Sequence, residues 1–146
     1  MAHVFTVDAS VFLNAFLSHE SGHAESLRLL AHLRAQAAPI VVPTLLLPEV
    51  AAAIARGQDD TGRARQFAAA LGRLPHVMLV PLDAALAQQA VDVAAQHRLR
   101  GSDAVYVAVA SRFGATLVTR DREQGERVAA IIPTRSPAEA LAEEEK

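Results

Sequence analysis

Short apolar segments alternate with longer helical patterns along the chain, and this alternation limits the fold more than any other feature of the sequence. The strand candidates are rich in β-branched residues and cover residues 3–7, 40–42, 76–80, 115–119 and 130–132. Apolar residues at helical spacing fall between them, over residues 10–17, 24–37, 44–56, 59–71, 83–97, 102–112 and 123–129. This alternation predicts an α/β fold, a three-layer α/β/α structure with a central, mostly parallel sheet of four to five strands.

The size of the chain suits one compact domain. Its 146 residues are 51% hydrophobic, which is enough for a sizeable core. We assign residues 1–135 to the α/β domain, and residues 136–146, rich in Ala and Glu, to a C-terminal tail with the composition of a helix. Gly57 is the expected end of the helix over residues 44–56, and Pro48 then lies in its first turn, where proline is best tolerated.

Four acidic residues lie at or near the ends of these predicted elements. Asp8 and Asp121 follow strands, Asp103 opens a helix, and Glu49 falls in or just after the first turn of another. Ligands of parallel sheets bind beyond the carboxyl ends of the strands, so we expect the acids at that edge. Carboxylates that converge repel one another, and a divalent cation is the usual remedy. The set predicts a metal-dependent hydrolase of phosphodiesters that uses Mg²⁺ or Mn²⁺.

Each acid also has a simpler explanation. Asp8, Asp103 and Asp121 are suited to cap a helix or to lie in its first turn, a role worth on the order of 1 kcal/mol. Glu49 is the only charge in an apolar segment over residues 45–54, where an isolated carboxylate is costly. An arginine partner for Glu49 would compensate that cost as well as a metal would, and this alternative stays open.

The charge of the chain bears on any nucleic-acid substrate. The formal net charge is −2, which excludes a global basic field, so a polyanion would need a local patch. Four arginines lie close in sequence to two of the acids, and their bidentate fork suits phosphate: Arg98, Arg100, Arg120 and Arg122. They are our candidates for contact with a polyanionic substrate, with solvated surface charges as the alternative. The absence of cysteine excludes disulfides, thiolate zinc sites and cysteine nucleophiles.

One motif points to a different chemistry. Residues 19–23 match the pattern H-E-x-x-H, which on one continuous helix would bind zinc. A Ser-Gly pair between two predicted helices interrupts the match, and no third ligand is evident, so a zinc protease is disfavoured. Residues 1–8 lack the cationic start and apolar core of a signal peptide, and the apolar stretches are too short to span a bilayer. We therefore expect a cytoplasmic protein with no membrane association.

Taken in order, four short segments resemble the PIN-domain ribonucleases and, among them, the VapC-like toxins of bacterial and archaeal toxin-antitoxin pairs. The segments are VDAS at residues 7–10, PEV at 48–50, SDAVYVAVA at 102–110 and LVTRD at 117–121. The resemblance covers most of the chain in length and element order. It implies that Mg²⁺ or Mn²⁺ is held by the catalytic acids Asp8, Glu49, Asp103 and Asp121. It further implies that Ser10 and Thr119 orient carboxylates or bound water, that RNA is the substrate, and that the protein is a homodimer with a small antitoxin partner.

The expected function is therefore a divalent-metal-dependent endoribonuclease, the toxin of a VapBC-type pair. Some relatives carry a further acid or asparagine after the last aspartate, and this chain offers Glu123 and Glu126, which leaves the number of metal ions open. The alternatives are a housekeeping RNA-processing PIN nuclease and a catalytically silent binding module. A third is a phosphotransferase with Asp8 as its nucleophile, although Ser10 stands where that class usually has a second aspartate.

Overall fold

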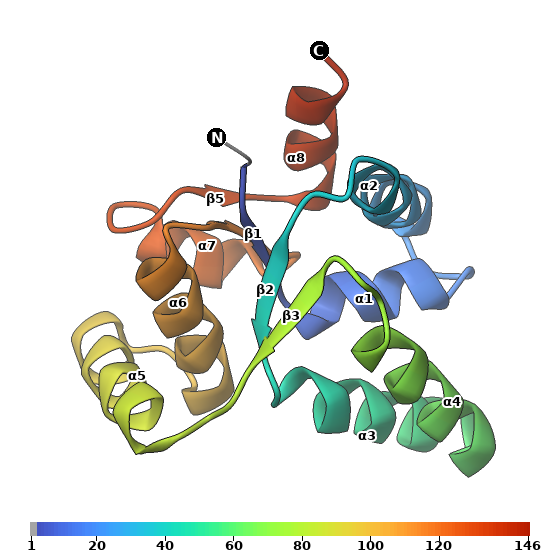
Figure 1. The fold of residues 1–146 in the computed structure, drawn as a ribbon, viewed down its shortest axis with the longest axis horizontal. Helices are drawn as coiled ribbons and strands as arrows, with labels where there is room; N and C mark the ends of the chain where they lie inside the picture. The colour runs from blue at the N-terminus through green and yellow to red at the C-terminus, as the bar shows by residue number, and fades with distance from the viewer. Residues whose placement is uncertain (1–2) are drawn as a thin grey trace.

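A computed structural model describes residues 3–146 as a five-stranded sheet between layers of helices (Figure 1). The strands are β1 (Phe5–Val7), β2 (Ile40–Pro43), β3 (Val77–Val80), β4 (Thr116–Val118) and β5 (Thr134–Arg135). Their order in the sheet is β3-β2-β1-β4-β5, and every neighbouring pair is parallel. The predicted α/β/α fold with a parallel central sheet is thus confirmed. Residues 1 and 2 of the expected domain lie outside the described part.

Helices cover both faces of this sheet. They are α1 (Ala9–Phe16), α2 (His23–Ala35), α3 (Leu46–Gln58), α4 (Thr61–Gly72), α5 (Ala84–His97), α6 (Gly101–Phe113), α7 (Arg122–Val128) and α8 (Pro137–Glu144). Helix α6 packs on β1, β2 and β4 with α5 behind it, and α1 packs with α2 and α3 on the opposite side (Figure 1). Helix α8 lies against α2, with Ala140 and Leu141 buried in the core. No helix in residues 3–146 is long and apolar enough to cross a membrane.

The central strands are buried because helices cover them on both sides. All residues of β1, β2 and β4 are buried, whereas β3 is an edge strand whose Met78 is exposed. Burial on both faces explains why these strands are apolar runs and not alternating patterns. One core cluster includes Phe5, Val7 and Leu117, and a second joins Leu86 of α5 to the α6 side of the sheet.

Two local predictions were wrong. The last strand is not at residues 130–132, because the N–H groups of Ile131 and Ile132 both donate to the carbonyl of Val128 and continue the turn after α7. Strand β5 begins after Pro133, where Thr134 aligns with Leu117 of β4. Helix α3 also does not stop at Gly57. It runs on to Gln58, and Asp59 takes the left-handed conformation that ends it, with φ of 49°.

The order of the strands creates a crevice next to β1. The chain passes from β1 to β2 and β3 on one side, and then to β4 and β5 on the other side of β1. Val7 aligns with Val118, and the N–H of Asp8 donates to the carbonyl of Val118 at 3.1 Å. Ligands of parallel sheets bind at such a reversal of strand order, beyond the carboxyl ends. The topology therefore brings the segments after β1 and β4 together.

Candidate active site

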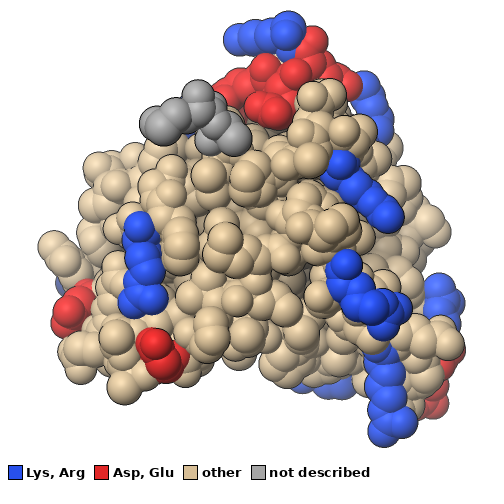
Figure 2. Space-filling view, viewed as in Figure 1, with Lys and Arg blue, Asp and Glu red and all other residues tan. Residues whose placement is uncertain are grey.

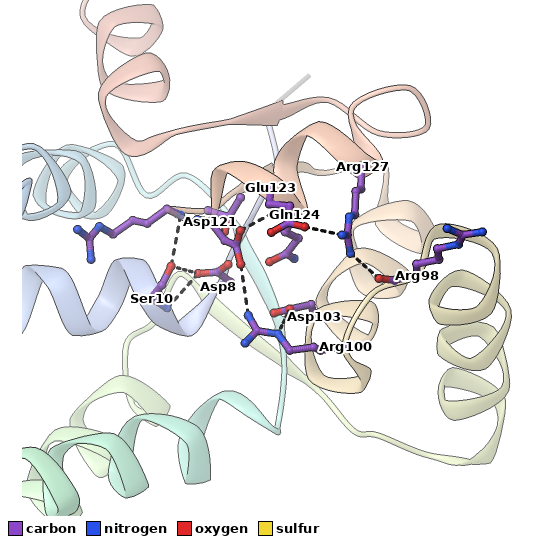
Figure 3. Close-up of polar contacts among 11 residues, drawn as sticks. Asp8, Ser10, Arg98, Arg100, Asp103, Asp121, Glu123, Gln124 and Arg127 are labelled. Atoms are coloured by element: carbon purple, nitrogen blue, oxygen red, sulfur yellow. Dashed lines mark hydrogen bonds and ion pairs between the residues drawn. The ribbon is translucent and has the colours of Figure 1, made fainter.

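The four predicted acids all lie around this carboxyl edge of the sheet. Asp8 directly follows β1, and Asp121 follows β4 after two intervening residues. Glu49 is in the first turn of α3, which begins just beyond β2, and Asp103 is in the first turn of α6. The side chains of Asp8, Asp103 and Asp121 come from three different elements and face one region in Figure 3. The expected common edge is therefore present.

Two of the four acids also cap helices. Asp8 is the N-cap of α1 and accepts from the N–H of Ser10, and Asp121 is the N-cap of α7 and accepts from the N–H of Gln124. Asp103 lies in the first turn of α6 and does not cap it. The simpler explanation thus holds for the local geometry of two acids. It does not explain why both lie at the same edge of the sheet.

Asp8 is a buried carboxylate, only 5% exposed. It accepts hydrogen bonds from the backbone N–H of Ser10 at 2.9 Å and from the Ser10 hydroxyl. Burial raises the pKa of Asp8, the hydrogen bonds from Ser10 and Thr119 lower it, and repulsion from Asp103 raises it further. Among residues 3–146, no cationic side chain forms an ion pair with Asp8. Its negative charge is therefore only partly compensated.

Glu49 is half-buried and is held by a tyrosine. The hydroxyl of Tyr106 on α6 donates to its carboxylate at 2.6 Å. Burial raises the pKa of Glu49, the bond from Tyr106 lowers it, and the nearby Asp8 and Asp103 raise it. The alternative of an arginine partner is wrong for the described structure, in which Glu49 has no ion pair.

Sequence reasoning missed Tyr106 as a site residue. Its pKa is raised by burial and by Glu49, so the phenol stays protonated and can donate. A signal was available, because Tyr106 is the only tyrosine of the chain and follows Asp103 by three residues. That spacing places both side chains on one face of a helix.

Asp103 and Asp121 share one arginine. Nε of Arg100 donates to Oδ2 of Asp103 at 3.0 Å, and Nη2 donates to Oδ2 of Asp121 at 3.2 Å (Figure 3). Arg100 precedes α6 directly as its N-cap residue, and its side chain is 77% exposed. One candidate RNA-binding arginine is thus part of the acidic site itself.

Two hydroxyls lie beside the acids, as expected. Besides its bonds to Asp8, Ser10 accepts from the backbone N–H of Arg120 through Oγ at 3.3 Å. Thr119 is buried, and its Oγ1 accepts from the N–H of Asp121 at 3.1 Å. Both residues therefore link the ends of β1 and β4. Their part in orienting a metal ligand stays a prediction.

The remaining candidate arginines have different surroundings. Arg120 donates to the Ser21 carbonyl at 2.9 Å and pairs with Glu20 at 3.4 Å, so it ties the loop between α1 and α2 to the site. Arg98 and Arg122 are exposed. On the face of the molecule in Figure 2, arginines are scattered, and acidic side chains gather at the end that holds α8. Contact of these arginines with RNA stays a prediction.

The H-E-x-x-H segment forms no zinc site. His19 lies in a turn, whereas His23 is the first residue of α2, so the two histidines do not share a helix. The Nδ1 of His23 is 2.9 Å from the carbonyl oxygen of Asn14, and Glu20 pairs with Arg120. The segment therefore lacks the continuous helix that the H-E-x-x-H motif needs.

The two acids that follow Asp121 lie on α7. Glu123 is exposed, pairs with Arg127 one turn along the helix and lines a small cavity with Arg100 and Asp121, and Glu126 lines a second polar cavity that Asp121 also borders. The carboxylate of Glu123 thus makes a surface ion pair. The neighbouring Gln124 is buried, 3% exposed, and neither polar atom of its side chain has a hydrogen-bond partner in the described part of the chain.

The carboxylates are suitable ligands for a divalent cation, although they do not converge closely enough in this structure to hold one. Within residues 3–146, no group of three acidic or histidine side chains has the arrangement that would hold a metal ion. Besides burial, the charge of Asp103 raises the pKa of Asp8, the charges of Asp8 and Asp103 raise that of Glu49, and Arg100 pairs with Asp103 and Asp121. Hard carboxylate oxygens are the ligands that Mg²⁺ and Mn²⁺ prefer. The buried, unpaired Asp8 is the residue that most needs such an ion.

Comparison with known proteins matches residues 5–130 to the family model of the PIN domain. Among solved structures, VapC20 of Mycobacterium tuberculosis, a sarcin-ricin loop cleaving toxin, has a TM-score of 0.70 and 22% identity over 88% of this chain and 95% of that one. A toxin-antitoxin complex from Klebsiella pneumoniae has a TM-score of 0.64 and 19% identity over 91% and 97% of the two chains. VapBC2 from Rickettsia felis, solved bound to a DNA fragment from its promoter, has a TM-score of 0.67 and 12% identity over 91% of this chain and 98% of that one. Identities this low show a shared fold. A comparison with curated proteins found no match.

Proposed function

The chain belongs to the PIN domain family, as the four motifs indicated, and from this premise we propose that it is a divalent-metal-dependent endoribonuclease and the toxin of a VapBC-type toxin-antitoxin pair. One observation carries the proposal. Four carboxylates lie at the carboxyl edge of the sheet, and the most buried of them, Asp8, has no ion pair among the described residues. Such an arrangement is costly unless a cation completes it.

The side chains of the site have separate roles in this proposal. The acids Asp8, Glu49, Asp103 and Asp121 would hold Mg²⁺ or Mn²⁺, and the bound ion would supply a Lewis acid that lowers the pKa of a water molecule and offsets negative charge on the scissile phosphate. Ser10 holds Asp8 in place by donating to it from both its backbone and its hydroxyl. The hydroxyl of Tyr106 on α6 holds Glu49 of α3 in place by donating to its carboxylate.

The exposed arginines near this edge supply the contacts to RNA phosphates. Arg98 and Arg122 have exposed side chains, and they lie shortly before Asp103 and directly after Asp121 in the sequence. The planar guanidinium fork matches phosphate oxygens in a bidentate way. Because the net charge is −2, this local set has to provide the attraction that an overall basic charge provides in other nucleases.

Replacement of Asp8 by Asn tests the enzyme. We expect wild-type protein to cleave RNA only with Mn²⁺ or Mg²⁺ present, and Asp8→Asn to lose at least about a hundred-fold in rate, as for other strong electrostatic contributors. Circular dichroism checks that the fold is kept. Asp83→Asn is the matched control, because Asp83 is an exposed N-cap of α5 far from the acids in the chain. An active Asp8→Asn enzyme, or wild-type protein that leaves total RNA uncut with either ion, would contradict the proposal.

A small antitoxin is the proposed protein partner. Two of the structural neighbours were solved as toxin-antitoxin assemblies, which supports this assignment. A basic side chain of such a partner would be attracted to the acidic site. An apolar cavity of about 700 Å³ between α1, α2 and α4, with Phe12, Phe16 and Leu27 in its lining, offers apolar contact as well.

Two measurements examine the assembly. Co-expression with the product of a neighbouring small reading frame should give a stable complex and relieve the growth arrest caused by the chain alone. Growth that is unaffected by expression of the chain would favour a housekeeping nuclease of the same family. We propose a homodimer on the family resemblance, and light scattering of the purified protein measures its mass.

A further inference from the structure

Arg100 occupies the space between two of the proposed metal-binding acids. Its guanidinium contacts Oδ2 of Asp103 at 3.0 Å and Oδ2 of Asp121 at 3.2 Å, and the described residues give it no other polar contact (Figure 3). The two carboxylates come from α6 and from the N-terminus of α7, so no local helix rule brings them to one arginine. Arg100 is therefore a cation placed by the tertiary fold at the acidic edge.

The positive charge of Arg100 reduces the electrostatic repulsion among the acids. Burial raises the pKa of Asp8 and of Glu49, and the nearby negative charge of Asp103 raises both further. The hydrogen bond to Asp103 and the nearby charge of Asp121 raise the pKa of Arg100, so it keeps its positive charge. It relieves only part of the repulsion, because its contacts are with Asp103 and Asp121 and do not reach Asp8.

The same geometry makes Arg100 easy to displace. Its side chain is 77% exposed, and exposed ion pairs are weak because water competes for both charges. A divalent ion carries twice the charge and would compete for the same Oδ2 atoms. The backbone of Arg100 stays fixed as the N-cap of α6, so the side chain would remain at the rim after it leaves the carboxylates.

We propose that Arg100 is a built-in counter-ion of the acidic site, which holds Asp103 and Asp121 in the metal-free protein and is displaced when the divalent ion binds. Arg100 thus competes with the metal and lowers the affinity of the site for it. Once displaced, the guanidinium lies exposed beside the bound ion, where its fork is available to a substrate phosphate. This inference rests on the metal site proposed above.

Metal affinity measures the competition directly. Full-length protein is freed of metal with a chelator and titrated with Mn²⁺ in a calorimeter. We expect Arg100→Ala to bind Mn²⁺ about two- to five-fold more tightly than wild type, the factor that corresponds to one exposed ion pair. Arg112→Ala is the matched control, since Arg112 is exposed at the other end of α6 from Asp103 and forms no ion pair among the described residues. Its Mn²⁺ affinity should equal that of wild type.

A second measurement follows the side chain itself. The Nε–H signal of Arg100 in the NMR spectrum, identified by its loss in Arg100→Lys, should be protected from exchange without metal and lose that protection when Mg²⁺ is added. Unchanged protection with Mg²⁺, equal or weaker Mn²⁺ binding by Arg100→Ala, or an equal gain in Arg112→Ala would each overturn the inference while leaving the metal site in place. Wild-type protein that binds no Mn²⁺ would instead refute the proposed function.

Discussion

The hydroxyl of Tyr106 on α6 donates a hydrogen bond of 2.6 Å to the carboxylate of Glu49 on α3, across 57 positions of sequence. Tyr106 is 2% exposed, so the contact is made at the boundary between the apolar core and the acidic edge. A buried phenol needs a hydrogen-bond partner, and a half-buried carboxylate needs a donor. The pair thus fixes the orientation of one proposed metal ligand from inside the core.

Removal of this hydroxyl should weaken both the fold and the metal site. Tyr106→Phe keeps the ring in place and is expected to lose about 1 kcal/mol of unfolding free energy. Because the hydrogen bond lowers the pKa of Glu49, its loss raises that pKa, and protons then compete with the metal at higher pH. The pH at which half of the protein binds Mn²⁺ should therefore shift upward, as calorimetry at several pH values would show.

Thr6→Val is the control for that change. The Thr6 hydroxyl donates to the Val41 carbonyl at 2.8 Å in the buried sheet, so its removal also breaks one interior hydrogen bond. We expect a similar loss of stability without a shift in the pH dependence of Mn²⁺ binding. If Tyr106→Phe and wild type showed the same pH dependence of Mn²⁺ binding, Tyr106 would contribute to the core alone and not to the metal site.

Asp8 should destabilise the metal-free protein at neutral pH. Burial raises its pKa in the folded state, so the folded protein is penalised when Asp8 is ionised, and the penalty fades as the pH falls through the raised pKa. Asn is as good an N-cap as Asp. In a chelator, Asp8→Asn should therefore be more stable than wild type by about 1 kcal/mol near pH 8, a common gain for replaced functional residues. The difference should shrink toward acid pH.

Urea unfolding at several pH values measures this difference. Asp83→Asn is the control, because Asp83 is an exposed capping residue. Mn²⁺ should reverse the ranking, because it stabilises only the protein that binds it, by about 2.7 kcal/mol at a concentration of one hundred times Kd. A wild-type protein that is more stable than Asp8→Asn near pH 8 in the chelator would disprove the account of Asp8.

The two roles of Asp121 can be separated by two substitutions. Ser is a good N-cap but has no carboxylate, so Asp121→Ser should retain the contact to the Gln124 N–H and lose metal affinity. Asp121→Ala loses both roles and should be less stable than Asp121→Ser by about 1 kcal/mol. Urea unfolding and Mn²⁺ titration give the two readouts. If Asp121→Ser bound Mn²⁺ as wild type does, the carboxylate would be a cap alone.

Replacement of Gln124 by Leu should stabilise the protein. The Gln124 amide is buried beside Asp121, and no described residue pairs with its oxygen or its nitrogen. A buried polar group without a partner costs about 1–3 kcal/mol, so we expect a gain of about 1 kcal/mol in urea unfolding. Gln96→Leu, at an exposed position of α5, should change stability by less than about 0.5 kcal/mol. A less stable Gln124→Leu would mean that the amide has a partner in solution.

Sequence analysis predicted the elements where the signals are local. Helix α5 (Ala84–His97) lies where the helix over residues 83–97 was predicted, and the four acids lie at the edge that the alternation of strands and helices required. It failed at two element boundaries, one set by a remote partner and one by the conformation of a single residue. The register of β5 is set by pairing with β4, and the end of α3 is set by the conformation of Asp59, so neither the apolar residues 130–132 nor Gly57 decided it.

The sequence by itself determined the α/β class, the order of the elements and the placement of the acids at element ends, because periodicity, caps and turn residues act within a few positions of the chain. Only the tertiary structure decided which side chains compensate those acids. Tyr106 reaches Glu49, and Arg100 reaches Asp121 across 21 positions, because packed helices bring distant segments within hydrogen-bond distance. Asp8 is left without an ion pair in the described chain for the same reason, since the helices that bury it bring no cation to it.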